Sequence, residues 1–243
     1  VPARRGKPGI DAVAFAVPPG SLDYWHERLT DRGVDVEGPR ERFGESSLRF
    51  TDPAGVRVEL VAADSPVAPW TDGGVPDRAA IRGLHGVTVL PVTPYATAGL
   101  LETLGFDRVG GEGDRIRYRA GGDHAAVVDV LDREATYGRE GQGTIHHLAV
   151  RVGSEAELYG WHALLRERDY DVSRVRDRNY FKSLYVREPG GILVELATET
   201  PGLTADEDID ELGGSLVLPE WFADERDLIE SQLPPLEAGP DGG

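Results

Sequence analysis

Two stretches of the sequence share one pattern, "DPAGVRVEL" at 52–60 and "EPGGILVEL" at 188–196. Each starts with an acid and a proline, passes through a glycine-containing turn, and ends in an apolar run that carries a glutamate. A short apolar run after a turn signal predicts a buried β-strand. A buried carboxylate costs free energy unless it is paired or bound to metal. Glu59 and Glu195 are therefore the first candidate functional residues.

The chain upstream of the two phrases is also repeated. The stretches "IDAVAFAVPPGSLDYWHERLTDRG" at 10–33 and "IHHLAVRVGSEAELYGWHALLRERD" at 145–169 each predict a strand followed by a helix. Ser21 and Ser154 are the expected N-caps of these helices. Short strands then precede each Pro/Gly turn and the glutamate-bearing strand, so each unit has the order βαβββ. A third copy lies between them, and its last strand carries Asp129 in place of glutamate.

We therefore predict an α+β fold of tandem βαβββ modules, which form curved mixed sheets around a cavity. The expected parts are modules at 10–63, 81–132 and 143–199, a Pro/Gly/Asp linker at 64–80 and a tail at 200–243. The tail is expected to hold a helix with Pro219 at its first position. Three modules leave one half-open sheet without a partner, which favours a homo-oligomer or a further module.

Composition excludes several functions. The 243 residues include no cysteine, which rules out disulfides, thiolate zinc sites and cysteine nucleophiles. A net charge of -17 argues against nucleic acid or an anionic membrane as partner. No membrane span or signal peptide is apparent, so a cytoplasmic protein is expected. Lysine occurs only at Lys7 and Lys182, and this acidic, lysine-poor composition suggests a halophilic source.

Two histidines could join the buried glutamate of the last module. Strand alternation places His147 on the same face as Ile145 and Ala149 at the start of that module. It places Glu195 on the same face as Leu193 and Ala197 at the end of the module. The first and last strands of a βαβββ unit can lie side by side, so both side chains could line one cavity. His85 holds the matching first-strand position of the preceding module. Two histidines and a carboxylate are the ligand set of a non-haem Fe(II) facial triad, which Mn(II) could also fill. The alternatives are core histidines and a glutamate paired with arginine.

The repeats, "IHHLAV" and "EPGGILVELAT" resemble the vicinal-oxygen-chelate superfamily, which includes glyoxalase I and extradiol dioxygenases. Further stretches, "ARRGKPG", "RDRNYFKSLYVREPGGILVELATETPGL" and "LPEWFADERDLIESQLPPL", resemble its hydroquinone-type ring-cleaving dioxygenases. Such enzymes have four βαβββ units and hold Fe(II) by His–His–Glu. His147 and Glu195 match two of these ligands. The third belongs to a first unit, of which residues 1–9 look like the trailing end, although His85 occupies the ligand position of other extradiol enzymes.

The resemblance implies an Fe(II)-dependent dioxygenase that opens a hydroquinone or catechol-like ring with O₂. It also implies that Tyr185, Arg178 and His146 act on bound substrate. A phenol and a guanidinium can stabilise a phenolate, and an imidazole can move a proton. One alternative is a glyoxalase-like isomerase or lyase, for which Glu59 would be the fourth ligand. Another is a metal-free, inactive binding protein.

Overall fold

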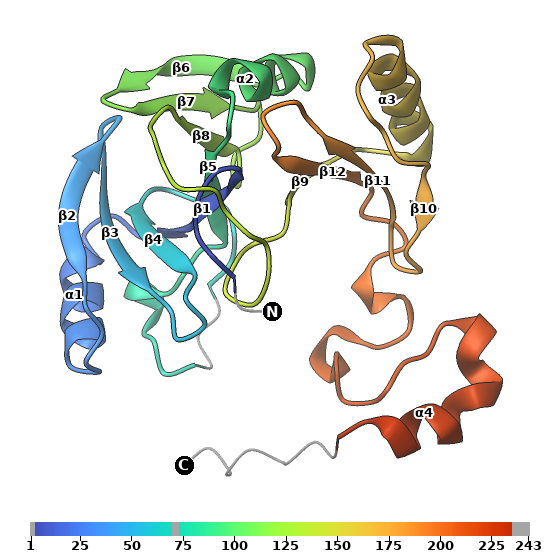
Figure 1. Cartoon of the computed structure of the whole chain (residues 1–243). Helices are drawn as coiled ribbons and strands as arrows, with labels where there is room; N and C mark the ends of the chain where they lie inside the picture. Colours follow the sequence, from blue (N-terminus) through green and yellow to red (C-terminus); the bar gives the residue numbers. More distant parts are fainter. Residues whose placement is uncertain (1–2, 70–72, 235–243) are drawn as a thin grey trace.

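The structure is a computed structural model that describes residues 3–69 and 73–234. Three units with the order strand, helix and three strands follow one another along the chain (Figure 1). The N-terminal unit comprises β1 (Gly9–Val17), α1 (Leu22–Thr30), β2 (Glu37–Arg42), β3 (Glu45–Thr51) and β4 (Arg57–Ala62). The middle unit comprises β5 (Leu84–Leu90), α2 (Pro94–Thr103), β6 (Asp107–Glu112), β7 (Arg115–Arg119) and β8 (Val127–Leu131). The C-terminal unit comprises β9 (Leu148–Arg151), α3 (Glu155–Glu167), β10 (Arg176–Asp177), β11 (Lys182–Arg187) and β12 (Leu193–Ala197).

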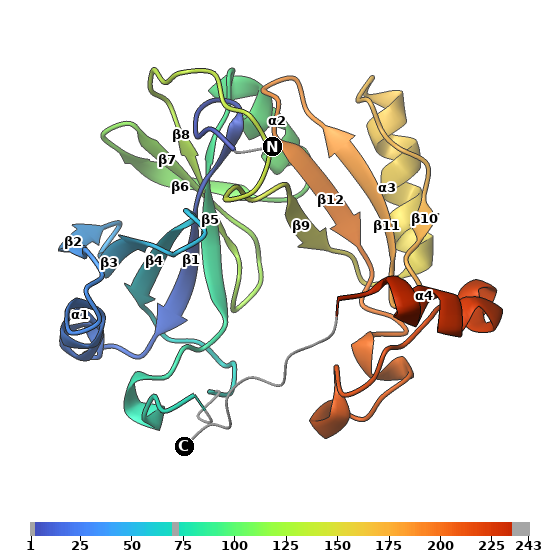
Figure 2. The same ribbon diagram turned by 60° about the horizontal axis from the view of Figure 1, so that its bottom comes forward.

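The units are distributed over two sheets. The N-terminal and middle units share an eight-stranded sheet of order β2-β3-β4-β1-β5-β8-β7-β6, joined by antiparallel pairing of β1 with β5. The C-terminal unit has its own four-stranded sheet of order β10-β11-β12-β9 (Figure 2). In every unit the first strand pairs in parallel with the last, as β1–β4, β5–β8 and β9–β12. The predicted fold of tandem βαβββ modules is confirmed.

The acids of the two opening phrases organise their own turns. Asp52 Oδ1 accepts a hydrogen bond from the backbone N–H of Val56 at 2.7 Å. Glu188 is 1% exposed and accepts bonds from the N–H groups of Gly190 and Ile192 and from the Thr97 hydroxyl. Buried polar groups must be satisfied in this way. The acid in each phrase therefore fixes the turn that precedes the glutamate-bearing strand.

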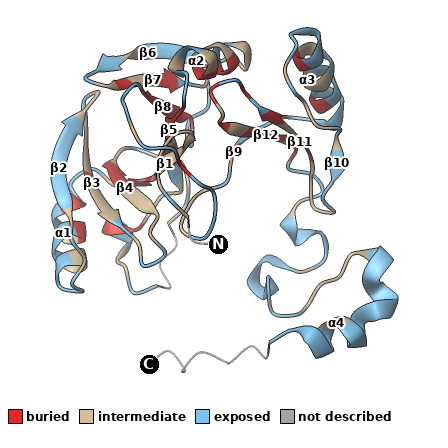
Figure 3. Ribbon diagram, in the orientation of Figure 1, coloured by how far each residue is buried: buried red, intermediate tan, exposed pale blue. Residues whose placement is uncertain are grey.

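A shared core holds the C-terminal unit against the middle unit. One hydrophobic cluster contains Leu100 and Leu101 of α2 together with Leu158 of α3, Leu184 of β11 and Ile192. Buried residues lie along these strands and helices, whereas the tail is mostly exposed (Figure 3). The hydrogen bond between α2 and the β11–β12 turn crosses the same boundary. These contacts fix the C-terminal sheet relative to the larger sheet.

Three local predictions differ from the structure. Ser154 caps α3 by accepting from Glu157 N, but Ser21 makes no capping bond, because its hydroxyl donates to Pro18 O instead. The expected tail helix is split into a 3-10 segment, η4 (Glu220–Glu225), and α4 (Arg226–Gln232). Pro219 precedes η4 rather than opening a helix.

The linker and the tail are mostly irregular. A 3-10 turn at Asp77–Ala79 lies within the expected linker, and Trp25 of α1 donates its indole N–H to Ala79 O at 2.8 Å. Linker residues 70–72 and tail residues 235–243 lie outside the described residues. The tail also contains two 3-10 turns, η2 (Leu203–Ala205) and η3 (Ile209–Glu211). In the described ranges, no helix is both long and apolar enough to cross a membrane.

Candidate metal-binding site

The structure brings His147 and Glu195 together. β9 and β12 are parallel neighbours, and Ala149 lies opposite Glu195 in their register. His147 precedes Ala149 by two residues, just before β9 begins, and its Nε2 lies 2.9 Å from Glu195 Oε2. Pairing of the first and last strands was the arrangement expected from the repeat. It sets an imidazole and a carboxylate side by side at one edge of the four-stranded sheet.

Glu195 is buried and only partly satisfied. The residue is 4% exposed, because β12 lies between two neighbouring strands and its other face, with Ile192, Val194 and Leu196, is in the core. Glu195 Oε1 is buried and has no hydrogen-bond partner. An unsatisfied buried carboxylate oxygen costs about 1–3 kcal/mol or more. A cation bound at this oxygen would remove the cost, so the donor set fits a divalent metal of the Fe(II) or Mn(II) type.

Tyr185 is the direct cross-strand neighbour of Glu195. The two residues lie opposite each other in the β11–β12 register, and same-face neighbours of this kind are in contact range. The Tyr185 ring meets the His147 ring edge to face, with centroids 5.5 Å apart. Burial raises the pKa of the Tyr185 phenol, and the Glu195 carboxylate raises it further, while Arg178 opposes the rise. Tyr185 is therefore held in its protonated form, as a hydrogen-bond donor.

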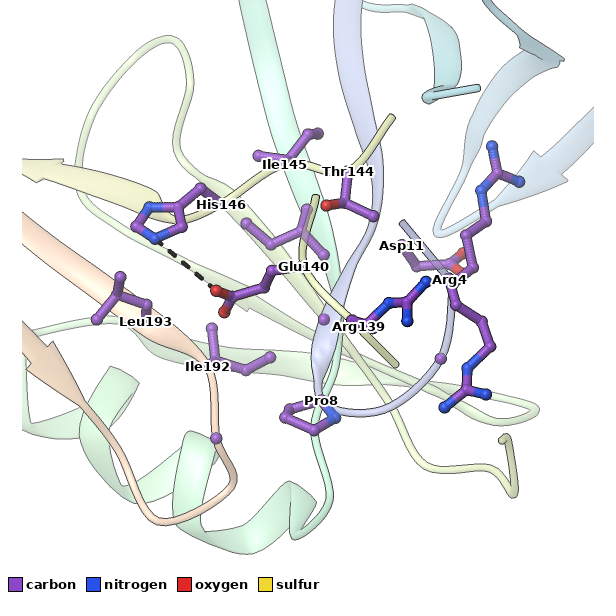
Figure 4. Close-up of a pocket in the computed structure, with 15 residues that line it drawn as sticks. Arg4, Pro8, Asp11, Arg139, Glu140, Thr144, Ile145, His146, Ile192 and Leu193 are labelled. Carbon is purple, nitrogen blue, oxygen red and sulfur yellow. Dashed lines mark ion pairs between the residues drawn. The ribbon is translucent and has the colours of Figure 1, made fainter. Parts of the chain in front are cut away.

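Arg178 and His146 lie on either side of this group. The Arg178 guanidinium lies 5.6 Å from the centre of the Tyr185 ring. His146 Nδ1 is 3.0 Å from His147 Nδ1, and its other nitrogen points toward Glu140, at 3.9 Å from Oε2 (Figure 4). His146 and Glu140 are exposed, whereas Glu195 is buried. A row of titratable groups thus leads from the buried carboxylate to solvent.

His85 does not join this group. It lies on β5 in the larger sheet, and its Nε2 is 3.3 Å from Glu45 Oε2. Arg117 Nη1 reaches the same Glu45 oxygen at 2.5 Å. Burial alone would raise the pKa of Glu45, but its bonds to His85 and Arg117 outweigh burial and lower it. The structure thus places His85 in a separate ion-pair network, and not with His147 and Glu195 as a third ligand.

Glu59 belongs to the same network as His85. Its Oε1 is 2.7 Å from Arg49 Nη2 and 3.5 Å from Arg115 Nη2. Arg115 and Arg117 both bind Asp129, with closest contacts of 2.8 Å. Arginine pairing therefore explains the half-buried Glu59, so this candidate for the fourth ligand of a glyoxalase-like site is engaged elsewhere. Pairing with arginine was the alternative that the sequence left open for such a glutamate.

An apolar cavity opens beside His147. It has a volume of 530 Å³ and lies between β9 and the central strands of the larger sheet. Its lining includes Val13, Val87 and Phe106 from the larger sheet and its surroundings, and Ile145 and Ala149 from the segment that carries His147. Cavities of this size and character hold small, mostly apolar ligands.

Known proteins share the sequence and fold. Residues 100–196 match the family model described as Glyoxalase/Bleomycin resistance protein/Dioxygenase superfamily. MhqO of Bacillus subtilis, which is named as a ring-cleaving dioxygenase, is 39% identical over 240 residues, covering 97% of this chain and 77% of that protein. The chlorohydroquinone/hydroquinone 1,2-dioxygenase of Sphingobium indicum is 34% identical over 247 residues, covering 96% of this chain and 75% of that protein.

The chain belongs to the glyoxalase/bleomycin resistance protein/dioxygenase superfamily. A crystal structure of a Bacillus subtilis protein described as a dioxygenase matches with a TM-score of 0.90 and 39% identity, covering 97% of this chain and 77% of that one. Glyoxalase I from Zea mays matches with a TM-score of 0.57 at 16% identity, covering 82% of this chain and 70% of that one, which shows the shared fold alone. The resemblance to ring-cleaving dioxygenases of this superfamily is confirmed. The chain is therefore an enzyme of the ring-cleaving dioxygenase class.

This superfamily member has its candidate site within the matched residues. Range 100–196 includes His146, His147, Arg178, Tyr185 and Glu195. In the part of the chain that the structure describes, no group of three or more His, Asp and Glu side chains is placed to hold a metal ion. His147 and Glu195 therefore form a partial ligand set, and their binding of metal stays a prediction.

The sequence analysis did not identify several residues that shape the candidate site or the separate ion-pair network of His85 and Glu59. Glu140 lies in an irregular loop, and no periodicity marks it as a partner of His146. The acid of the second phrase, Glu188, was treated as part of a turn signal, although it anchors that turn to α2. Arg115 and Arg117 alternate along β7, and their spacing could have marked one charged strand face.

Proposed function

We propose that this chain is an Fe(II)-dependent ring-cleaving dioxygenase that acts on hydroquinone or catechol-like aromatics with O₂. The observation that carries the proposal is the contact of 2.9 Å between His147 and Glu195, beside a buried carboxylate oxygen that has no partner. Relatives at 34–39% identity named as ring-cleaving dioxygenases support the same reaction class. The expected cytoplasmic location and the homo-oligomer belong to this proposal as predictions.

His147 Nε2 and the Glu195 carboxylate would hold the metal. A neutral imidazole and a carboxylate suit Fe(II), and Mn(II) is the alternative. When bound, the metal would supply a Lewis-acid centre where a ring oxygen and O₂ meet. A third protein ligand would come from a second copy of the chain in the expected homo-oligomer. Glu59 and His85 are engaged in the separate network.

Tyr185 and Arg178 would stabilise the charge of the bound substrate. The phenol of Tyr185 keeps its proton, because burial raises its pKa. It can therefore donate a hydrogen bond to a ring oxygen that is losing its own proton. Arg178, stacked near the same ring, adds a positive charge where the oxyanion develops. Preoriented donors of this kind commonly contribute about 100-fold or more to kcat.

His146 would move the proton that leaves the ring hydroxyl. It contacts His147 on one side and faces Glu140 on the other, so it lies between the buried pair and solvent. A base within hydrogen-bond reach of the reacting group is the first requirement of general base catalysis. The apolar cavity beside His147 would keep water away from the edge of the ring nearest β9, while the rest of the ring lies over Glu195 and Tyr185.

Oxygen uptake tests the proposal. The full protein, loaded with Fe(II) without O₂, is expected to consume O₂ when hydroquinone or catechol is added, and chelation should abolish the uptake. His147→Ala should weaken metal binding by more than the roughly 10–100-fold that loss of an outer-shell partner costs. His162→Ala is the matched control, because His162 lies on α3, across the sheet from the site.

Two outcomes would contradict this function. Full activity after chelation would remove the metal from the mechanism. Conversion of substrate without O₂ would instead support an isomerase or lyase of the same superfamily. A folded protein that binds no metal under either condition would favour a non-catalytic binding role.

A further inference from the structure

Three arginines, Arg174, Arg176 and Arg178, alternate along the outer segment of the C-terminal sheet. Arg176 lies opposite Ser183 in the β10–β11 register, and Ser183 lies opposite Ala197 in the β11–β12 register. Side chains alternate between the faces of a sheet. Arg176 therefore shares its face with Ser183 and with Tyr185, two residues further along β11.

Arg174 and Arg178 extend this row on the same side. Val175, between the first two arginines, packs against the hydrophobic core on the opposite face. Arg178 lies over the ring of Tyr185, at 5.6 Å from its centre. We call the three arginines the arginine row.

The arginine row lacks acidic partners. Within residues 3–69 and 73–234, the guanidinium groups of Arg174 and Arg176 form no ion pair and no hydrogen bond. Asp177 lies beside them in sequence, but its Oδ1 accepts from the N–H of Asn179 at 2.8 Å. The protein has a net charge of -17, so acidic partners are abundant elsewhere on its surface. Positive charges this close along one segment repel one another, and a bound anion would relieve the repulsion.

The distance from the row to the site suits one aromatic ring. Strands lie about 4.8 Å apart and rise about 3.3 Å per residue, so the Cα atoms of Arg176 and Tyr185 are roughly 8 Å apart. A ring whose oxygen lies beside Tyr185 would direct a substituent on its far side toward Arg176. Guanidinium groups bind carboxylates in a bidentate manner and are suited to this contact.

We propose that the arginine row binds an anionic substituent, such as a carboxylate, on the aromatic substrate. This inference rests on the proposed ring-cleaving function, because it assumes that a ring oxygen is held at His147, Glu195 and Tyr185. The preferred substrate class is then a hydroquinone or catechol that carries an acidic group. Neutral rings lack that contact.

Ligand binding without turnover tests the proposal. The full protein, loaded with Fe(II) in the absence of O₂, is titrated calorimetrically with carboxyhydroquinone and with methylhydroquinone, a neutral ring of similar size. We expect the carboxylated ring to bind about tenfold more tightly, since two exposed ion pairs each contribute modestly. About 0.5 M salt should reduce this preference, because exposed charges are screened.

Arginine variants test whether the preference for carboxyhydroquinone over methylhydroquinone comes from the arginine row. The double variant Arg174→Gln/Arg176→Gln should bind both rings equally and leave the affinity for methylhydroquinone unchanged. Arg166→Gln is the matched control, because Arg166 is an exposed arginine of α3 in the same unit. It should keep the tenfold preference. Equal binding of the two rings by the unaltered protein, or loss of the preference in Arg166→Gln as well, would overturn the proposal.

The test separates this proposal from the proposed function. If carboxyhydroquinone is preferred but no ring consumes O₂ afterwards, the arginine row stands and the dioxygenase assignment fails. If both rings are cleaved with the same kcat/KM and the double variant changes neither, the dioxygenase stands and the arginine row fails.

Discussion

Two buried glutamates of the C-terminal unit should respond to the same substitution in opposite ways. Glu188 and Glu195 are 1% and 4% exposed; Glu188 opens the turn before β12, and Glu195 lies in the middle of β12. Glu188 accepts three hydrogen bonds, whereas one oxygen of Glu195 has no partner. Replacing each carboxylate by the isosteric amide keeps the volume and changes only charge and hydrogen bonding. Stability should therefore depend on Glu188 and metal binding on Glu195.

Without metal, only Glu188→Gln should lower the free energy of unfolding appreciably. The amide has one acceptor oxygen, so at least one of the three donors would face an NH₂ group. Loss of a buried, charge-assisted bond costs about 2 kcal/mol, which lowers Tm by about 4–8 °C in a chain of this size. Glu195→Gln removes a buried charge that is incompletely satisfied. The gain in solvation offsets the lost contact with His147, so we expect a change below about 1 kcal/mol.

Metal should reverse the comparison. A ligand at 100 times its Kd stabilises the folded state by about 2.7 kcal/mol. If Glu195→Gln weakens binding about 100-fold, the same metal concentration equals the Kd and stabilises by only about 0.4 kcal/mol. Glu188→Gln should keep the full 2.7 kcal/mol increment, because Glu188 does not face the site. Urea denaturation under anaerobic conditions, with and without Fe(II) or Mn(II), measures the free energy of unfolding of each variant in both states.

Equal metal-induced stabilisation of the unaltered protein and Glu195→Gln would refute the assignment of Glu195 as a ligand. A loss of 2 kcal/mol or more in the free energy of unfolding of metal-free Glu195→Gln would contradict the expected small effect. It would mean that the Glu195 carboxylate is satisfied within the protein and that no cation is needed at its Oε1 atom.

Further predictions concern the phenol and the ion-pair network. Tyr185→Phe should lower kcat about 100-fold in oxygen uptake with little change in KM, because the lost hydrogen bond acts on developing charge. Arg117→Met should cost about 3 kcal/mol in urea denaturation, since it removes both guanidinium contacts to the buried Asp129 carboxylate. The folded-state pKa of Glu45 lies below 4.5, so its contribution to stability is present above that pH and is lost as pH falls below it. Glu45→Gln should therefore flatten the acid limb of the stability curve, and no flattening would count against the contact with His85.

Much of the fold could be predicted from local patterns. Alternation of apolar residues gave β11 and β12, and the repeat gave the order βαβββ in all three units. The strand that carries His147 was expected from 145 onward, but β9 begins at Leu148. The tail helix was expected to be continuous because its composition is helical, although no buried contact supports its first turns. Local propensity does not fix an element that packs against nothing.

The two glutamates show where sequence information ends. Glu59 and Glu195 occupy the same position of the same repeated phrase, and alternation predicts burial for both. Whether a buried carboxylate meets arginine or remains open to a metal depends on the side chains that neighbouring strands present. Arg49 and Arg115 face Glu59, whereas Tyr185 and His147 face Glu195.

The sequence by itself determined the repeated βαβββ units and the apolar character of their last strands. These follow from periodicity and turn chemistry, which act over a few residues. Only the tertiary structure decided that His85 lies with Glu45 and that the arginine row borders Tyr185. Such contacts depend on strand order and register between segments far apart in the chain, and local patterns do not encode them.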